Sequence, residues 1–176
     1  MGFLEYTKND VTFLSADDSN CLYWFVDVAF AVHEDFKSHT GAVFSLGKGS
    51  IISMSTKQKI NTRSSTEAEL VALDDALAKI LWTKLFIEAQ DHTIRINIVY
   101  RDNQSSMKLE QNGKESSGKR TRHFSIKYFY ATDLIKRGMM KIIYCPTELM
   151  VGDYMSKPLV RTQFNNFRAW IMNQPR

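Results

Sequence analysis

The chain has 176 residues, of which 44% are hydrophobic and 24% are charged, and its net charge at pH 7 is +4. This length favours one domain with a sizeable core, and the composition excludes disordered, collagen-like and membrane-spanning classes. No apolar run approaches the roughly 18 residues of a membrane-spanning helix, and the start of the chain lacks a secretory signal. Cys21 and Cys145 form no zinc or disulfide pattern, so reduced thiols in an intracellular protein are expected.

The first half of the chain predicts an antiparallel start to a sheet. Aromatic and β-branched residues at 22–32 indicate a central strand. Two more strands are expected at 40–46 and 50–55, and the glycine-rich residues 47–49 between them suit a tight hairpin turn.

The second half alternates helices and strands. Apolar residues recur with helical spacing from 64 to about 90, without glycine or proline, which predicts a long helix. A strand at 94–100 should pair in parallel with an earlier strand, because a crossover helix precedes it. Further helices are expected at 103–111, 124–137, 147–156 and 161–172, and a last strand at 139–144. This order predicts an α/β fold with a mixed sheet and helices on its faces.

Positive charge is concentrated between residues 114 and 141. Eight basic residues face two acids in this segment, so its net charge is +6 and that of the rest of the chain is −2. Such a segment suggests a face that binds polyanions. A solvated helix and loop would explain the same charges.

Two aspartates lie at positions where a carboxylate is either costly to bury or common in functional sites. Asp27 interrupts an apolar strand, where a desolvated carboxylate needs compensation. Pairing with a buried arginine is the structural alternative to a metal or catalytic role there. Asp102 follows the strand at 94–100, at an edge where site residues gather in α/β folds. An aspartate at that point could equally cap the following helix.

Helical periodicity separates two glutamates near the start of the long helix. Ser64 and Glu67 match a capping box, and Glu67 falls on a face expected to be solvated. Glu69 instead lies on the core-facing stripe and, like Asp27, requires a cation. Nearer the C-terminus, Asp153 and Glu148 compete as a fourth candidate, and the sequence pattern alone does not decide between them.

Carboxylates from such distant segments could cluster only with compensating charge. Mg²⁺ bound by a few carboxylates and substrate phosphate oxygens is the expected species. Two such ions roughly 4 Å apart activate a water and stabilise the leaving oxygen in phosphodiester hydrolysis.

Motifs across residues 22–159 resemble the RNase H domain that closes the polyprotein of copia-type LTR retrotransposons. The matching stretches are Phe25-Val-Asp27, Ser64-Ser-Thr-Glu-Ala-Glu69-Leu, Tyr100-Arg-Asp102-Asn-Gln-Ser, Arg120-Thr-Arg-His123 and Pro146-Thr-Glu-Leu-Met-Val-Gly-Asp153-Tyr-Met-Ser-Lys-Pro158. The resemblance implies an RNase H-like fold, with three antiparallel strands followed by parallel strands in a five-stranded mixed sheet and helices on both faces. It also implies that residues 1–20 resemble the connection that follows reverse transcriptase, and that residues 21–176 form the RNase H domain with a C-terminal helix.

The same resemblance implies a catalytic metal site and a reaction. Its members would be Asp27, Glu69, Asp102 and Asp153, holding two Mg²⁺ ions, with Mn²⁺ as a substitute. The implied reaction is endonucleolytic hydrolysis of the RNA strand of RNA–DNA hybrids during reverse transcription, which leaves a 3′-hydroxyl and a 5′-phosphate.

Two groups of residues are expected to contact the hybrid. Gln104, beside Asp102, resembles a position that contacts the RNA strand, which its 2′-hydroxyls distinguish from DNA, and Ser65, Thr66 and Asn103 are further expected substrate contacts. Phosphates of the DNA strand would meet the basic motif of Lys119, Arg120, Arg122 and His123. The expected partners of the chain are the hybrid and the reverse transcriptase domain of the same polyprotein, and no membrane is expected. The isolated domain is expected to be a monomer. Its expected location is the cytoplasm, in a retrotransposon particle, or the nucleus.

Two departures from cellular RNases H keep alternatives open. Residues 144–152 contain no histidine, although cellular enzymes carry one in this loop, and residues 28–30 are apolar rather than small and polar. A catalytically weak or inactive module that binds hybrid or double strands is therefore the second hypothesis. An integrase or transposase core shares the sheet, but it lacks an acid on the first long helix, so Glu69 argues against it.

Overall fold

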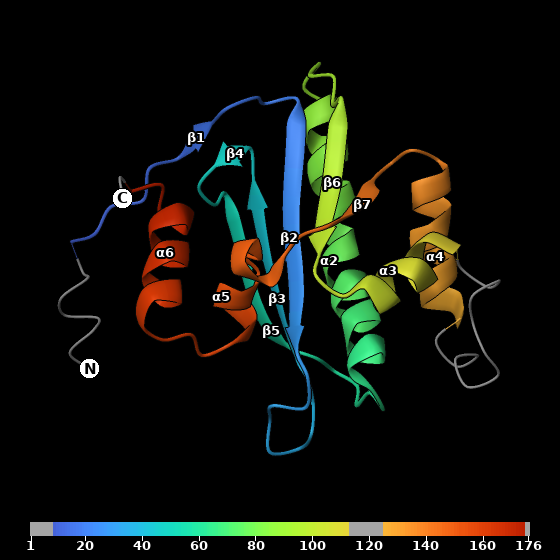
Figure 1. The fold of residues 1–176 in the computed structure, drawn as a ribbon. Coiled ribbons are helices and arrows are strands. Elements are labelled where there is room, and N and C mark those ends of the chain that lie inside the picture. Colours follow the sequence, from blue (N-terminus) through green and yellow to red (C-terminus); the bar gives the residue numbers. More distant parts are fainter. Residues whose placement is uncertain (1–8, 113–124, 175–176) are drawn as a thin grey trace.

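A five-stranded mixed sheet forms the centre of the computed structural model, which describes residues 9–112 and 125–174 (Figure 1). The strand order is β5-β3-β2-β6-β7. Within this sheet, β2, β3 and β5 pair antiparallel, and β6 and β7 then add in parallel, as the sequence predicts. The strands are β2 (Cys21–Ala29), β3 (His39–Ser45), β5 (Ile52–Lys57), β6 (Ile96–Arg101) and β7 (Lys141–Tyr144).

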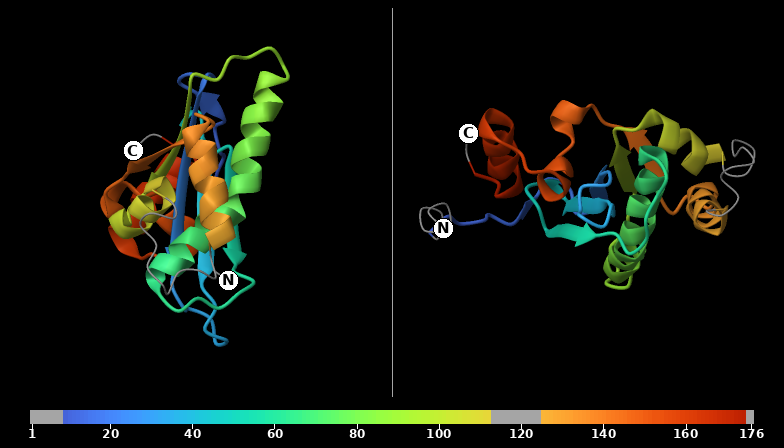
Figure 2. Two further views of the ribbon diagram at one scale, coloured as in Figure 1. Left: turned by 90° about the vertical axis from the view of Figure 1, so that its right-hand side faces the viewer. Right: turned by 90° about the horizontal axis from the view of Figure 1, so that it is seen from below.

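The two faces of the sheet are covered by different helices. Alternate residues of β2, beginning with Leu22 and Trp24, are fully buried beneath α2 and α4. The opposite face carries Phe25, which packs with a second apolar cluster that includes Phe167. Figure 2 shows α2 and α4 on one side of the strands and α5 and α6 on the other. The helices are α2 (Ser65–Glu88), α3 (Gln104–Asn112), α4 (Ser125–Lys136), α5 (Asp153–Ser156) and α6 (Arg161–Ile171).

The start of α2 has the serine half of the predicted capping box, whereas the glutamate bonds one residue earlier than the cap. The Ser64 hydroxyl accepts from the Glu67 N–H at 3.2 Å, and the Glu67 carboxylate accepts from the Arg63 N–H at 2.7 Å. The expectation that Glu67 faces solvent is wrong, because its side chain is buried. The reason is that α2 contacts the sheet as well as α3 and α4, so it has little solvated surface at this end.

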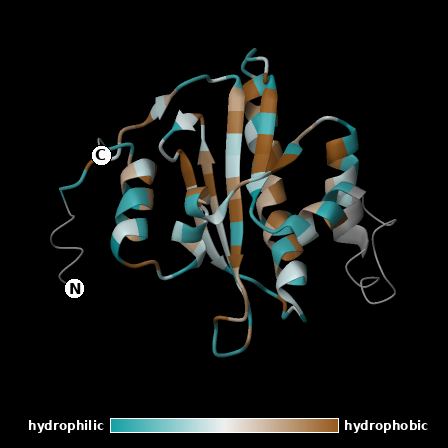
Figure 3. Cartoon of the chain, in the orientation of Figure 1, coloured by the Kyte–Doolittle hydropathy of each residue, from teal (hydrophilic) through white to brown (hydrophobic). Residues whose placement is uncertain are grey.

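Some elements differ in extent from the prediction. The strand expected at 22–32 ends at Ala29, because the chain turns at Ala31, whose φ is +52°. The helix expected at 147–156 divides into a 3₁₀ turn, Thr147–Leu149, and the short α5. Figure 3 shows apolar residues along β2 and β6, in keeping with strands covered on both faces.

The N-terminal segment is attached to the C-terminal helix. Two short strands, β1 (Ser15–Ala16) and β4 (Gly47–Lys48), pair antiparallel in a separate small sheet. The Phe13 N–H donates to the Met172 carbonyl at 3.0 Å. A domain boundary near residue 20 remains a prediction. No helix within the described ranges is both long and apolar enough to cross a membrane.

Candidate metal centre

Three acids from three elements meet at one end of the sheet. Asp27 lies in β2, Glu69 in the first turns of α2 and Asp102 directly after β6. One carboxylate oxygen from each lies within 4.8 Å of the others. The register explains part of this arrangement, because β2 and β6 are adjacent and parallel and pair Phe25 with Tyr100. Both aspartates follow two residues later and therefore lie at the same level of the sheet.

Asp153 lies against Asp27 but is outside this group of three. It begins α5, and its residue is 2% exposed. The position depends on a close approach of α5 to β3 at Gly41. A Cβ at Gly41 would be only 2.6 Å from both the Gly152 carbonyl oxygen and the Ser156 nitrogen. The structure thus places Asp153 beside Asp27 in a buried position, whereas its competitor Glu148 is exposed.

Lys157 connects the two aspartates. Its Nζ is 2.9 Å from Asp153 Oδ1, 3.2 Å from Asp27 Oδ2 and 3.3 Å from Asp27 Oδ1. The Ser156 hydroxyl also donates to Asp27 Oδ2. Although burial by itself lowers the pKa of Lys157, the carboxylates of Asp27 and Asp153 raise it above its ordinary value. Lys157 is therefore a charged partner of both acids.

A second cation holds Glu69. The Arg101 guanidinium is fully buried and donates to the Glu69 carboxylate at 2.7 Å and to its main-chain carbonyl at 2.6 Å. Glu110 in α3 lies 3.4 Å from the same guanidinium and is also fully buried. The sequence indicated that Glu69 needed a cation but did not identify one. The available signal was an arginine at the end of an apolar strand, immediately before Asp102.

Burial and mutual repulsion keep two of the acids weakly acidic without metal. The pKa of Glu69 is raised to about 8, mainly by burial, with Arg101 opposing the rise and Asp27 and Asp102 contributing to it. The pKa of Asp153 is raised to about 7, again mainly by burial and by Asp27, against the opposing effect of Lys157. Carboxylates that resist losing their protons in the metal-free protein are expected where a cation normally compensates them.

Supporting residues surround Asp102. Thr147 donates its hydroxyl to Asp102 Oδ2 at 3.2 Å. The N-terminus of α3 is capped by Asn103, whose side chain accepts from the N–H groups of Ser105 and Ser106 at 3.0 and 3.1 Å. The capping alternative for Asp102 is therefore wrong, and its carboxylate is available to the acidic group.

The predicted substrate contacts are only partly within the described residues. Ser65 and Gln104 are exposed at the first residues of α2 and α3, and Thr66 is half-buried beside Ser65. All three lie on the helices that begin near the acids. Four further predicted contacts lie outside the described residues, namely Lys119, Arg120, Arg122 and His123.

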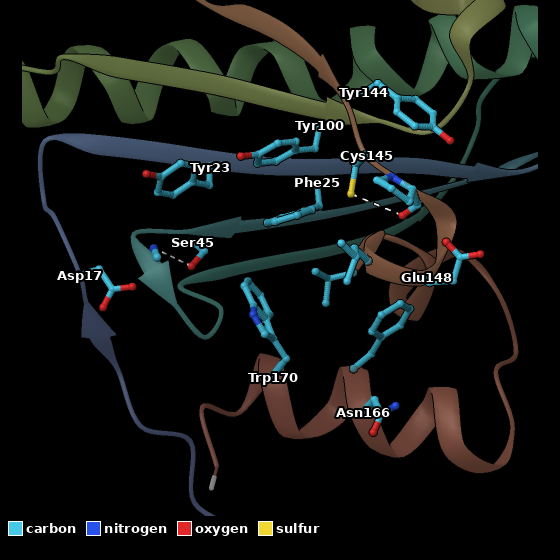
Figure 4. Close-up of a pocket in the computed structure, with 15 residues that line it drawn as sticks. Asp17, Tyr23, Phe25, Ser45, Tyr100, Tyr144, Cys145, Glu148, Asn166 and Trp170 are labelled. Carbon is cyan, nitrogen blue, oxygen red and sulfur yellow. Dashed lines mark hydrogen bonds between the residues drawn. The ribbon is translucent and has the colours of Figure 1, made fainter. Parts of the chain in front are cut away.

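A cavity of about 740 Å³ lies between the sheet and α6, and none of the four acids lines it. Figure 4 shows the rings of Tyr23, Phe25 and Tyr100 along the sheet and Trp170 of α6 opposite them. The Phe25 and Tyr100 rings stack at 4.9 Å, and Trp170 meets Phe25 edge-on at 5.5 Å. These contacts show that the aromatic residues pack the sheet against α6.

Comparison with known sequences finds polyproteins of transposons. The chain is 30% identical over 171 residues to the retrovirus-related Pol polyprotein from transposon RE1 of Arabidopsis thaliana, and 28% identical over 128 residues to that from transposon TNT 1-94 of Nicotiana tabacum. These matches cover 96% and 73% of this chain but only 12% and 10% of the two polyproteins. The chain therefore spans about a tenth of the length of these relatives. No protein-family model matches the chain.

Comparison with solved structures identifies the fold. LC11-RNase H1, isolated from compost by a metagenomic approach, superposes with a TM-score of 0.54 at 15% identity, over 73% of this chain and 86% of that one. The same enzyme in complex with an RNA/DNA hybrid gives a TM-score of 0.53. The fold is that of the ribonucleases H, as the motifs predict. In sequence, the chain is a homologue of retrotransposon Pol polyproteins.

Proposed function

We propose that this chain is a ribonuclease H that cleaves the RNA strand of RNA–DNA hybrids with the help of divalent ions. The observation that carries the proposal is the convergence of Asp27, Glu69 and Asp102, from two strands and a helix, within 4.8 Å in an RNase H fold. The complex of LC11-RNase H1 with an RNA/DNA hybrid supports the choice of substrate class.

The residues present fit a hard divalent cation. The donor set consists only of carboxylate oxygens, which Mg²⁺ and Mn²⁺ prefer to nitrogen or sulfur. The raised pKa values of Glu69 and Asp153 indicate that the acids lack sufficient compensation without an ion. Asp27, Glu69 and Asp102 would hold one ion, and Asp27 with Asp153 would hold a second. Bound ions would supply an activated water and stabilise the leaving oxygen.

The protein's own groups would orient the acids and the substrate. Arg101 fixes the carboxylate of Glu69, and Thr147 holds one oxygen of Asp102. Asn103, Gln104, Ser65 and Thr66 would contact the RNA strand, where a 2′-hydroxyl distinguishes it from DNA. The basic motif of Lys119, Arg120, Arg122 and His123 would bind phosphates of the DNA strand.

The proposed context is reverse transcription in a copia-type element. The relatives are Pol polyproteins about ten times longer than this chain, so the reverse transcriptase of the same polyprotein is the proposed partner. A retrotransposon particle in the cytoplasm, or the nucleus, is the proposed place of action.

The direct test is cleavage of an RNA–DNA hybrid whose RNA strand carries a label. The chain should cleave the hybrid with Mg²⁺ or Mn²⁺ but not with EDTA, and should leave double-stranded and single-stranded RNA intact. Asp27→Asn and Asp102→Asn should each reduce the rate more than about 100-fold, a larger loss than removal of a supporting contact to a metal ligand causes. Glu148→Gln is the matched control, because Glu148 is an exposed acid from the segment that leads to α5. It should retain the rate.

Two results would contradict the proposal. Cleavage that persists in both aspartate variants, with unchanged circular dichroism, would reject the site. Absence of cleavage with either ion, combined with salt-sensitive binding of the hybrid, would instead identify the chain as a binding module.

A further inference from the structure

The ammonium of Lys157 lies between two carboxylates that sequence and fold both assign to the site. Its Nζ is within 3.3 Å of both oxygens of Asp27 and 2.9 Å from Asp153 Oδ1. The two aspartate side chains are only 1% and 3% exposed. The lysine therefore supplies a full positive charge at the point where these two acids meet.

The Asp27 carboxylate is shared between two groups of acids. It belongs to the close set with Glu69 and Asp102, and it also receives Lys157 and the Ser156 hydroxyl. A divalent ion between Asp27 and Asp153 would require the oxygen atoms that the ammonium occupies. Two cations cannot occupy one place, and at such distances their repulsion is large even at an intermediate dielectric.

The side chain of Lys157 can move out of the site into solvent, whereas that of Arg101 cannot. Its side chain is 33% exposed, whereas that of Arg101 is completely buried. A lysine has a flexible four-carbon stem and a strongly hydrated head, so its ammonium can move to solvent at modest cost. Arg101 is held by Glu69 and Glu110 in the interior and cannot do the same.

We propose that Lys157 is a built-in competitor for the second divalent ion. In the metal-free chain the ammonium neutralises Asp27 and Asp153, and a divalent ion binds between these two carboxylates only when the ammonium withdraws. The first ion takes two of its three acids, Glu69 and Asp102, from outside the contacts of Lys157 named above, so the ammonium opposes that ion less than the second. This inference rests on the metal site of the proposed function, and it predicts two ion affinities that differ widely.

The first experiment is calorimetric titration of the whole chain with Mn²⁺ in the absence of nucleic acid. Lys157→Gln should strengthen binding of the second ion at least about tenfold and that of the first by a smaller factor, since the ammonium contacts both acids of the second position but only Asp27 of the first. Lys157→Arg keeps the charge and should leave the second ion weak. Lys141→Gln removes an exposed lysine from β7 and serves as the matched control. Equal second-ion affinity in the wild type and Lys157→Gln would overturn the proposal.

A second measurement follows stability in EDTA. Lys157→Gln should lower the melting temperature by about 3 °C or more, because Asp27 and Asp153 lose their shared cation. The double variant Asp153→Asn/Lys157→Gln should recover at least half of that loss, because only one of the two charges remains. A loss that Asp153→Asn does not relieve would assign Lys157 a role unrelated to these carboxylates and would overturn the proposal.

A measurement on the unaltered chain covers the case in which Lys157→Gln does not fold. The ¹³C NMR signal of the Lys157 ε-carbon, assigned by its loss in Lys157→Arg, should shift during binding of the second Mg²⁺ equivalent and not the first. A signal that is unchanged throughout the titration would overturn the proposal. Failure of hybrid cleavage with normal Mn²⁺ binding would reject the ribonuclease and leave the competition between lysine and ion intact, so the two proposals fail separately.

Discussion

The acidic cluster is neutralised in two different ways on its two sides. On the side of α2, Glu69 is held by Arg101, which is buried, paired also with Glu110 and bonded to main chain. On the side of α5, Asp27 and Asp153 are held by Lys157, which reaches in from a partly exposed position. The first arrangement keeps an acid in place permanently, and the second can be exchanged for another cation.

This difference follows from the chemistry of the two side chains. A guanidinium makes several hydrogen bonds in a fixed plane and suits a buried structural role. An ammonium is compact, well hydrated and mobile, so it suits a position that an ion takes over. Four predictions test or sharpen the comparison, beginning with the largest expected effect.

Loss of the buried cation should be the most damaging change. Arg101→Met should lower the free energy of unfolding by about 3–5 kcal/mol, because it leaves Glu69 and Glu110 buried without a partner charge. Urea unfolding followed by circular dichroism measures the change. Arg95→Met is the control, since the side chain of Arg95 is 62% exposed in its pair with Asp18 and should contribute less than about 1 kcal/mol. Similar losses in the two variants would remove the distinction between structural and exchangeable cations.

The metal-free protein should become less stable as pH rises. The pKa of Glu69 is about 8 in the folded chain against an ordinary 4.5, so between these values the folded state holds a proton that the unfolded state has released. Stability that is complete below pH 4.5 is then lost as pH rises through 8, and Asp153 acts in the same direction up to about 7.

We expect Glu69 alone to lower the free energy of unfolding in EDTA by roughly 3 kcal/mol between pH 5.5 and pH 8.5, and Asp153 to add a smaller decrease. Glu69→Gln should remove most of this dependence, and saturating Mg²⁺ should restore stability at pH 8.5 by binding only the folded state. An equal fall in the wild type and Glu69→Gln would show that other groups cause it.

Displacing α5 should weaken ion binding only on the side of the acidic cluster where Lys157 contacts Asp27 and Asp153. Gly41→Ala places a Cβ 2.6 Å from main-chain atoms of Gly152 and Ser156, so α5 must move away from β3. The expected loss of stability is about 1–3 kcal/mol. In a Mn²⁺ titration, the second ion should be affected and the first should bind nearly as before. Gly138→Ala is a control for ion binding: its Cβ meets nothing within 4 Å, so both ions should bind as before, although its φ of +68° makes this substitution cost some stability through backbone strain. A weaker first ion in Gly41→Ala would contradict the separation of the two sides.

The smallest change in stability is expected at Thr147, at the edge of the site. Thr147→Val removes the 3.2 Å hydrogen bond to Asp102 while keeping the shape of the side chain. Stability should change by less than about 1 kcal/mol. Affinity for the first ion should fall by roughly tenfold, the lower range for loss of a supporting contact to a metal ligand. Unchanged ion affinity would show that Thr147 does not orient the carboxylate.

Local patterns predicted the sheet and the long helix because their causes are local. Alternation in the strands and the apolar stripe from residue 64 onward depend on which face is buried, and the sequence carries that information directly. The error at Glu67 shows the limit of this reasoning. A helix covered by the sheet and by two other helices buries residues that a single-face pattern assigns to solvent.

The sequence pattern singled out two of the acids, and the family resemblance supplied Asp102 and Asp153, but neither identified their partners. Asp27 and Glu69 each contradict the apolar pattern around them, and that contradiction is visible in the order of the residues alone. Arg101 and Glu69 are 32 residues apart, and Lys157 and Asp27 are 130 apart. Which cation meets which acid depends on the packing of distant elements, although the spacing of four residues between Asp153 and Lys157 was compatible with a contact on one helix.

The distance along the chain between Asp27 and Ser156, 129 residues, also has a consequence for synthesis. A ribosome releases β2, which carries Asp27, long before it makes α5. Until then a growing polypeptide carries the Asp27 carboxylate without the hydroxyl and the ammonium that meet it in the finished fold. A nascent chain of this kind therefore acquires its complete acidic centre only after α5 has been made and packs on the sheet.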